Sequence, residues 1–214
     1  MKEGMLISFE GGEACGKSVQ IKLFKEYLDK NNIDYIITRE PGGTEVGESI
    51  RNILLHSEFN LSAEAEFLLF SASRTTLIQD VVNPALREGK VVILDRYFDS
   101  SYAYQGYAGN LQLEDIKNIT EFAIKGTVPD LTFLIDITYE ESMRRKLSDE
   151  ALKNLDRFES KGKEYHDKVR NGYLKLAELQ KERFCVIDSN QSREQILAQI
   201  IKEFENCYKK KTGN

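Results

Sequence analysis

The residues best suited to chemistry lie between Gly11 and Ser18, in the order Gly-Gly-Glu-Ala-Cys-Gly-Lys-Ser. This spacing satisfies the phosphate-loop pattern G-x-x-x-x-G-K-[ST]. Glycines let the backbone approach phosphate oxygens closely, and N–H groups at a helix N-terminus bind those oxygens. In this pattern Lys17 reaches the β- and γ-phosphates, and the Ser18 hydroxyl is a ligand of Mg²⁺. We therefore predict that a nucleoside triphosphate binds to Gly11, Gly12, Glu13, Ala14, Cys15, Gly16, Lys17 and Ser18.

The segments on either side of this loop have the secondary structure that it requires. Residues 5–9 are apolar enough for a buried strand, and the apolar residues of 17–30 follow a helical spacing. Strand-type segments recur at 33–38, 90–94, 131–137 and 183–188. Helices are expected at 45–55, at 62–82, from about 100, and at 113–125, 139–161, 165–181 and 192–208. This alternation predicts one α/β domain over residues 1–214, with a five-stranded parallel sheet flanked by helices on both faces.

Polar residues follow three of the predicted strands. The phosphate loop comes after the first strand, Arg39-Glu40 after the second, and Asp95-Arg96 after the third. Ligands of such sheets bind at the carboxyl ends of the strands. We therefore expect these three segments to meet in one site.

The composition is that of a globular protein, with 41% hydrophobic and 30% charged residues. The net charge of −5 and the lack of a long basic block argue against nucleic acid as a partner. We find no signal peptide and no apolar run of membrane-spanning length, so we expect no membrane partner. The three cysteines, Cys15, Cys185 and Cys207, lack metal-ligand spacing, which is typical of reduced thiols in a cytoplasmic protein.

The phosphate loop does not define the reaction by itself. A GTPase would need the base-reading motif N-K-x-D, which this sequence lacks. A motor or transporter ATPase would typically need a longer chain, although Leu94-Asp95 could supply its acidic magnesium residue. The length of the chain favours a smaller enzyme.

Several further motifs give the chain a resemblance to the thymidylate kinase family over nearly its whole length. They are Phe9-Glu10-Gly11, Thr-Arg-Glu-Pro-Gly-Gly-Thr at 38–44, Leu-Phe-Ser-Ala-Ser-Arg at 69–74, Asp-Arg-Tyr at 95–97, Ser-Tyr-Ala-Tyr-Gln-Gly at 101–106, Pro-Asp-Leu at 129–131 and Leu-Asp-Arg-Phe-Glu at 155–159. The resemblance implies a P-loop nucleoside monophosphate kinase-like fold and a homodimer. It also implies Mg²⁺-dependent transfer of the γ-phosphoryl group of ATP to dTMP, giving dTDP and ADP.

The resemblance assigns charged residues to the phosphates. Arg39 and Arg96 are similar to the arginines that hold the acceptor phosphate, and a guanidinium offers paired donors to phosphate oxygens. Asp95 resembles the acidic partner of Mg²⁺, beside Ser18. Glu13 resembles the acidic residue near the 3′-hydroxyl of the acceptor sugar.

The resemblance also assigns residues to the base and the sugar of dTMP. Phe70 is similar to the aromatic residue that stacks on thymine, and Arg74, one helical turn later, to the residue that hydrogen-bonds O4. Gln105 resembles the residue that contacts the base from the other side. Tyr104 resembles the aromatic residue beside the deoxyribose, where a bulky ring leaves no room for a 2′-hydroxyl. The local pattern around Phe70, taken alone, favours a core residue over one that stacks on a base.

A closing lid is expected at about 142–160. The phosphate loop has no basic residue before Lys17, so the chain resembles the bacterial subgroup in which the lid supplies the cation. The candidates are Arg144, Arg145, Lys146, Lys153 and Arg157. Arg145 and Lys153 remain alternatives for the residue that reaches the phosphates, and Arg145 completes the predicted catalytic set of Lys17, Arg96, Asp95 and Glu13.

Two other functions stay open at this point. One is a kinase of another nucleotide or deoxynucleoside, and the other is a non-catalytic, regulatory nucleotide-binding protein. The apolar stretch around 64–82 is a candidate dimer face, although a helix that is apolar all round can also lie in the core.

Overall fold

Parallel strands form the centre of the molecule. The computed structural model describes residues 4–56, 61–148 and 161–213. The strands are β1 (Met5–Gly11), β2 (Tyr35–Arg39), β3 (Val91–Asp95), β4 (Leu131–Asp136) and β5 (Phe184–Asp188). They form one five-stranded sheet in the order β2-β3-β1-β4-β5, and each neighbouring pair is parallel. The predicted parallel sheet is therefore confirmed.

Helices connect the strands. They are α1 (Lys17–Lys30), α2 (Glu45–His56), α3 (Ala63–Leu77), α4 (Asn83–Arg87), α5 (Phe98–Ser101), α6 (Leu113–Ile124), α7 (Tyr139–Ser148), α8 (Lys163–Leu179) and α9 (Arg193–Thr212). Two π-helical turns, η1 (Ile78–Val82) and η2 (Tyr102–Ala108), continue α3 and α5. None of the helices in the described ranges is long and apolar enough to cross a membrane.

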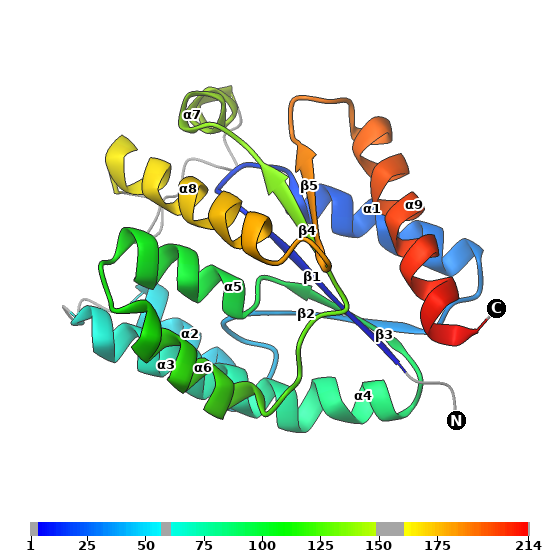
Figure 1. Ribbon diagram of the computed structural model, residues 1–214, viewed down its shortest axis with the longest axis horizontal. Helices are drawn as coiled ribbons and strands as arrows, with labels where there is room; N and C mark the ends of the chain where they lie inside the picture. The colour runs from blue at the N-terminus through cyan, green and yellow to red at the C-terminus, as the bar shows by residue number, and fades with distance from the viewer. Residues whose placement is uncertain (1–3, 57–60, 149–160, 214) are drawn as a thin grey trace.

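The helices cover both faces of the sheet. Figure 1 shows α1 and α9 on one side, and α3, α5, α6 and α8 on the other. Alternate side chains of β1 face the two layers: Ile7 and Phe9 pack with Phe24 of α1 and Phe204 of α9. Leu6 lies in a second core with α3, η1 and α4. This alternation explains why the strand is apolar throughout, because neither face meets water.

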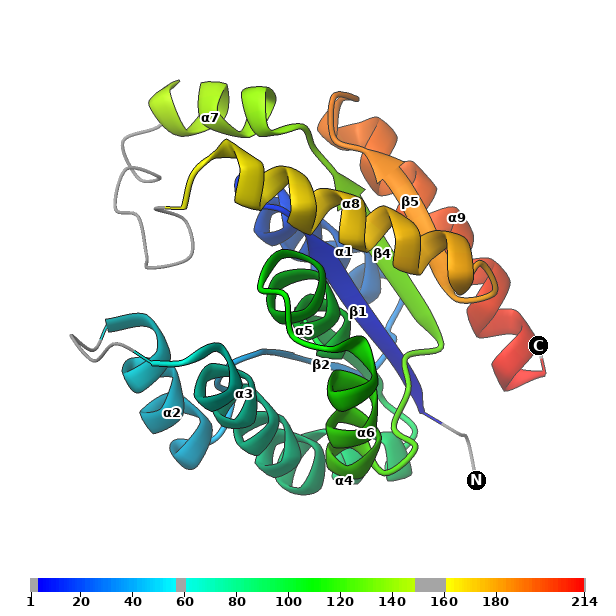
Figure 2. The ribbon, with the colours of Figure 1, turned by 60° about the vertical axis from the view of Figure 1, so that its left-hand side comes forward.

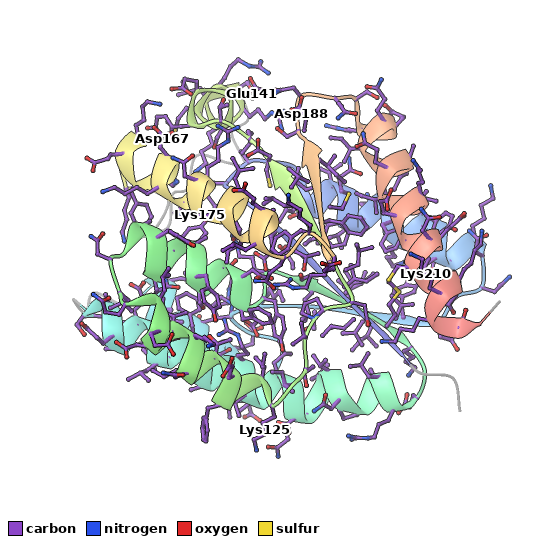
Figure 3. All side chains as sticks on the ribbon, in the orientation of Figure 1. Lys125, Glu141, Asp167, Lys175, Asp188 and Lys210 are labelled. Atoms are coloured by element: carbon purple, nitrogen blue, oxygen red, sulfur yellow. The ribbon has the colours of Figure 1, made fainter. Side chains whose placement is uncertain are left out.

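Charged side chains lie on the outer surface of these layers. Figure 3 shows Lys125, Asp167, Lys175 and Lys210 projecting from the outer surfaces of the helical layers. In Figure 2, α8 lies between α7 and α5, so it joins the expected lid region to the body of the protein.

The structure corrects several predicted boundaries. The helix predicted at 62–82 continues through η1 into α4, whose first turn contains Pro84. The strand predicted at 33–38 begins only at Tyr35, and the last helix extends to Thr212. Of the helical region predicted at 139–161, α7 covers 139–148, and residues 149–160 lie outside the described residues.

A buried carboxyl group joins β1 to the helices that carry the site. The side chain of Glu10 accepts hydrogen bonds from the backbone N–H of Tyr97 (2.7 Å) and the hydroxyls of Ser100 (2.7 Å) and Tyr173 (2.9 Å). Burial raises the pKa of Glu10 to about 7, and the Asp99 carboxylate adds to this shift. Glu10 therefore holds β1, α5 and α8 together at the carboxyl end of the sheet.

We expect Glu10→Gln to remove part of the pH dependence of stability. The pKa of this carboxyl is about 7 in the folded protein against an ordinary value of 4.5, so the folded state binds more protons between these values. The free energy of unfolding should therefore fall as the pH rises through this window, by up to about 1.4 kcal/mol per pH unit. Urea unfolding at several pH values measures this slope.

The control for this measurement is Glu178→Gln, at an exposed position on α8. It should keep the pH profile of the wild type. If Glu10→Gln also keeps that profile, the raised pKa of Glu10 is wrong.

Candidate active site

The phosphate loop joins the end of β1 to the start of α1. Gly16, which precedes α1, has a φ of +97°, in the region that glycine favours. A Cβ at Gly11 would lie 2.4 Å from the carbonyl oxygen of Ile135, so only glycine fits there. The loop leads directly into the N-terminus of a 14-residue helix, whose free N–H groups favour an anion. The predicted sequence of strand, loop and helix is therefore confirmed.

A cavity of about 640 Å³ lies over the phosphate loop. Residues 13–18 line it, so most of the predicted triphosphate-binding residues face one space. Its other walls include Arg145 and Lys146 of α7, residues between β5 and α9, and the start of α9. Gly11 and Gly12 lie outside this lining; Gly11 is buried at the end of β1.

Two cations meet at the carbonyl oxygen of Gly11. Lys17 Nζ lies 3.4 Å from this oxygen, and Arg96 Nη1 donates a hydrogen bond to it at 3.1 Å. Lys17 comes from the first turn of α1, whereas Arg96 follows β3. The structure therefore brings together two residues that are 79 positions apart. The phosphate-loop pattern places Lys17 on the donor phosphates, and the family resemblance places Arg96 on the acceptor phosphate.

Arg96 is fixed from several directions. Its φ is +67°, and its backbone N–H donates to the carbonyl of Phe9 on β1 at 3.0 Å. Its guanidinium forms an ion pair with Glu13 and donates to the hydroxyl of Tyr173 at 3.1 Å. The Tyr104 ring lies 5.0 Å from the guanidinium carbon, and its hydroxyl donates to Glu13 at 3.0 Å. These contacts hold the cation in place before any ligand arrives.

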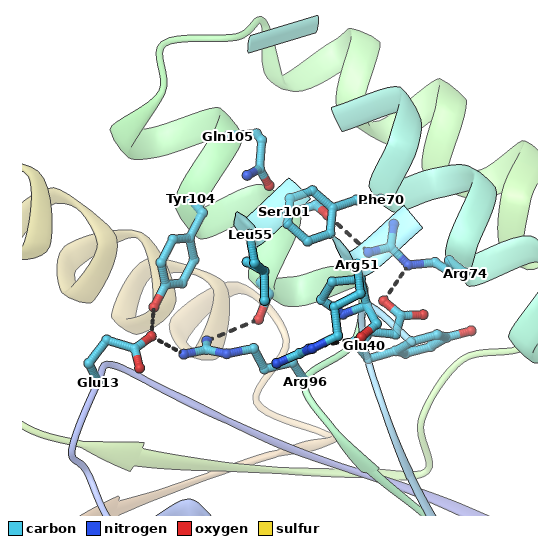
Figure 4. Close-up of a pocket in the computed structure, with 13 residues that line it drawn as sticks. Glu13, Glu40, Arg51, Leu55, Phe70, Arg74, Arg96, Ser101, Tyr104 and Gln105 are labelled. Atoms are coloured by element: carbon cyan, nitrogen blue, oxygen red, sulfur yellow. Dashed lines mark hydrogen bonds and ion pairs between the residues drawn. The ribbon is translucent and has the colours of Figure 1, made fainter. Parts of the chain in front are cut away.

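A second cavity, of about 220 Å³, lies on the other side of Glu13. Figure 4 shows Glu13, Arg96 and Tyr104 together at one end of it, and Phe70, Arg74 and Gln105 toward the other. Glu13 lines both this cavity and the one over the phosphate loop. The site therefore has two compartments with a carboxylate at their boundary.

Arg74 lies at the far end of this second cavity and is almost fully buried. Its Nε donates to Glu40 at 2.9 Å and its Nη2 to the Ser101 hydroxyl at 2.9 Å. Among the described residues, nothing hydrogen-bonds its buried Nη1. A buried donor without a partner is costly, so this end of the cavity suits a ligand that carries an acceptor.

Phe70 has both of the roles that its sequence context allows. It lines the second cavity, and it also packs against the core around Tyr104 and Tyr173. Phe70 therefore contributes both to the core and to the wall of the cavity.

The structure places Arg39 away from the cavity. Its side chain is 52% exposed and pairs with Glu48 at 3.0 Å. Arg51 of α2, which our sequence reasoning missed, lines the cavity instead, and it donates to the carbonyl of Pro41 at 2.9 Å. The available signal was weak: Arg51 and Leu55 share one face of a predicted helix, and both line the cavity.

The two predicted magnesium residues lie on different segments. Ser18 is exposed on the first turn of α1 and lines the cavity over the phosphate loop. Asp95 ends β3, paired in register with Phe9, and lies outside the lining of both cavities. Within residues 4–56, 61–148 and 161–213, no group of three or more His, Cys, Asp or Glu is placed to hold a metal.

Arg145 is one of the predicted lid cations, and it contacts the phosphate loop. It donates to the carbonyls of Ala14 (3.3 Å) and Ser189 (2.8 Å) and pairs with Glu141 at 2.8 Å. Arg144, by contrast, is 71% exposed and pairs with the same glutamate. Lys146 is buried and lines the cavity, and the remaining candidates, Lys153 and Arg157, lie outside the described residues.

Comparisons with known proteins agree with this geometry. The family model described as thymidylate kinase matches residues 9–200. The thymidylate kinase of Kosmotoga olearia is 44% identical over 206 residues, which cover 96% of this chain and 98% of that protein. That of Caldanaerobacter subterraneus subsp. tengcongensis is 45% identical over 206 residues, with 96% and 97% covered.

A solved structure gives the same result. The crystal structure of thymidylate kinase from Ehrlichia chaffeensis has a TM-score of 0.77 and 30% sequence identity, covering 95% of this chain and 99% of that one. The likeness thus extends over nearly the whole chain. By sequence and by fold, the chain belongs to the thymidylate kinase family.

Proposed function

We propose that this protein transfers the γ-phosphoryl group of ATP to dTMP, giving dTDP and ADP. The observation that carries the proposal is the pair of cavities that meet at Glu13, with Lys17 and Arg96 bound to one carbonyl between them. ATP would occupy the cavity over the phosphate loop, and dTMP the cavity lined by Phe70 and Arg74. The two phosphates then face each other across Glu13.

Phosphoryl transfer needs both substrates to be held in position and positive charge to lie beside their phosphates. The acceptor phosphate oxygen is already a nucleophile, so the attack on the γ-phosphorus needs no general base. Lys17 neutralises charge on the donor phosphates, and Arg96 binds the acceptor phosphate together with Arg51. Because Arg96 is held by Glu13 and Tyr173, its charge is placed before the transition state forms.

The residues that line the acceptor cavity also suit a pyrimidine deoxynucleotide as the ligand. The Phe70 ring would stack on the base, and Arg74 Nη1 would donate to O4. Tyr104 would lie beside the sugar, where its ring, held by Glu13, leaves no room for a 2′-hydroxyl. Gln105 would contact the base from the opposite side.

We assign Mg²⁺ to the donor side. Ser18, which lines the cavity over the phosphate loop, would be a protein ligand, and substrate phosphates would supply further oxygens. Asp95 ends β3 outside that lining and would act as the acidic partner of the ion, directly or through water. When bound, the ion would neutralise charge on the β- and γ-phosphates. We assign Arg145 as the lid cation, since it already contacts the loop through Ala14.

We propose further that the chain forms one domain with a lid at about 142–160, that it works in the cytoplasm without nucleic acid or membrane partners, and that it is a homodimer. The free thiols of Cys15, Cys185 and Cys207 support a reducing compartment. Exposed apolar side chains on three neighbouring helices support the dimer; they are Ile53 on α2, Leu68 on α3 and Phe122 on α6.

The substrate is tested by an acceptor panel. With ATP and Mg²⁺, ADP formation should have its highest kcat/KM with dTMP, ahead of dUMP, dCMP and UMP. A higher kcat/KM with any of the other three would make this a kinase of another nucleotide. No ADP formation with any acceptor would favour a regulatory nucleotide-binding protein.

The two cations are tested by substitution. We expect Lys17→Ala and Arg96→Ala each to lower kcat by at least about 100-fold, because each removes charge stabilisation from the transition state. Lys175→Ala, on the outer surface of α8, is the control and should keep the wild-type kcat. If both site variants turn over at near the wild-type rate, the assignment of these cations is wrong.

The dimer is tested by sedimentation. Phe122→Glu places a charge on an apolar side chain that is 78% exposed, so it should convert a dimer into a monomer. Leu179→Glu makes the same kind of change at the end of α8, where the side chain is 70% exposed, and should leave the dimer intact. A monomeric wild type, or a Phe122→Glu dimer of unchanged stability, would contradict the proposed face.

A further inference from the structure

A buried carboxylate contacts Gln105 from outside the proposed substrate cavity. Glu66 of α3 is 7% exposed, and its Oε1 accepts a hydrogen bond from Gln105 Nε2 at 2.9 Å. Gln105, on η2, is 3% exposed and lines the cavity, whereas Glu66 is not part of that lining. The two residues belong to helices that are separate in the chain, so packing alone brings them together.

The chemistry of this contact defines which way the Gln105 amide points. The Glu66 oxygen accepts this hydrogen bond, so the amide turns its NH₂ group toward Glu66. The carbonyl oxygen of Gln105 then lies on the opposite side of the amide. Figure 4 shows this oxygen on the side of Phe70 and Ser101, toward the cavity.

The base end of the cavity therefore presents two different groups. Arg74 Nη1 is a buried donor, and the Gln105 carbonyl oxygen is an acceptor. Thymine and uracil carry the complementary pair, an acceptor at O4 and a donor at N3–H. Cytosine carries the reverse pair, a donor at its 4-amino group and an acceptor at N3. A turned Gln105 amide would present its NH₂ group instead and would suit cytosine.

We propose that Glu66 is a positioning residue that holds the Gln105 amide in one orientation and so makes the site selective for 4-oxo pyrimidines. This inference rests on the proposed function, because it assigns the base of the acceptor to this end of the cavity. A simpler role for Glu66 would be to tie α3 to η2. That role affects all acceptors equally, whereas the positioning role changes the preference between bases.

The test is Glu66→Gln, assayed with dTMP, dUMP and dCMP. A glutamine at 66 can donate or accept, so Gln105 becomes able to turn. The ratio of kcat/KM for dTMP to that for dCMP should fall at least about tenfold, the size expected when one buried hydrogen bond is no longer selected. The ratio for dTMP to dUMP should stay unchanged, because these two bases share the same edge.

Matched variants isolate the effect. Glu64→Gln removes the same charge from an exposed position on the same helix and should change neither ratio. Glu66→Asp keeps a group that only accepts and should retain the wild-type preference for dTMP over dCMP. In a Gln105→Met background there is no amide to orient, so adding Glu66→Gln should not change the dTMP to dCMP ratio further.

The outcomes distinguish a failure of the positioning role of Glu66 from a failure of the proposed function. If Glu66→Gln lowers kcat/KM for all three acceptors by the same factor, or leaves every value unchanged, the positioning role is wrong. If the wild type does not prefer dTMP at all, the proposed function itself fails. Should Glu66→Gln not fold, Glu66→Met, which removes the acceptor with little change in size, is judged by the same ratios.

Discussion

The convergence of Lys17 and Arg96 on the carbonyl oxygen of Gly11 is the interaction on which the rest of the site depends. Two cations at one point repel each other unless other groups hold them. Glu13 pairs with Arg96, and the buried Glu10 holds the Tyr173 hydroxyl that Arg96 also contacts. Charge is thus concentrated where two phosphate groups would meet, at the carboxyl end of the central strand.

The fold explains how positive charge is concentrated at the end of β1. β1 lies in the centre of the sheet, between β3 and β4, so its end meets the residues that follow β3. The backbone N–H of Arg96 donates to Phe9, and its left-handed φ turns the chain into α5. α8 also restrains Arg96, because it carries Tyr173 and packs against η2. Strands therefore place the cations, and helices then restrict their side chains.

Much of this could be predicted from the sequence, because the relevant signals are local. The phosphate loop and the polar strand ends lie in short motifs, and parallel strands bring such ends together. Arg51, the Glu40–Arg74 pair and the Glu66–Gln105 contact could not be predicted in this way. Each depends on how α2, α3 and η2 pack beside the sheet, which the spacing within one segment indicates only weakly, as for Arg51, or not at all. The position of Arg39, paired with Glu48 at the surface, has the same origin.

The central claim is that donor and acceptor occupy two cavities joined at Glu13. A single compound in which adenosine and thymidine are linked through their 5′-hydroxyls by five phosphates tests it directly. Its stoichiometry by calorimetry, and its inhibition pattern against each substrate, can be measured on the same sample. The account predicts one molecule per chain and inhibition that is competitive with both ATP and dTMP. Two molecules per chain, or competition with only one substrate, would contradict it.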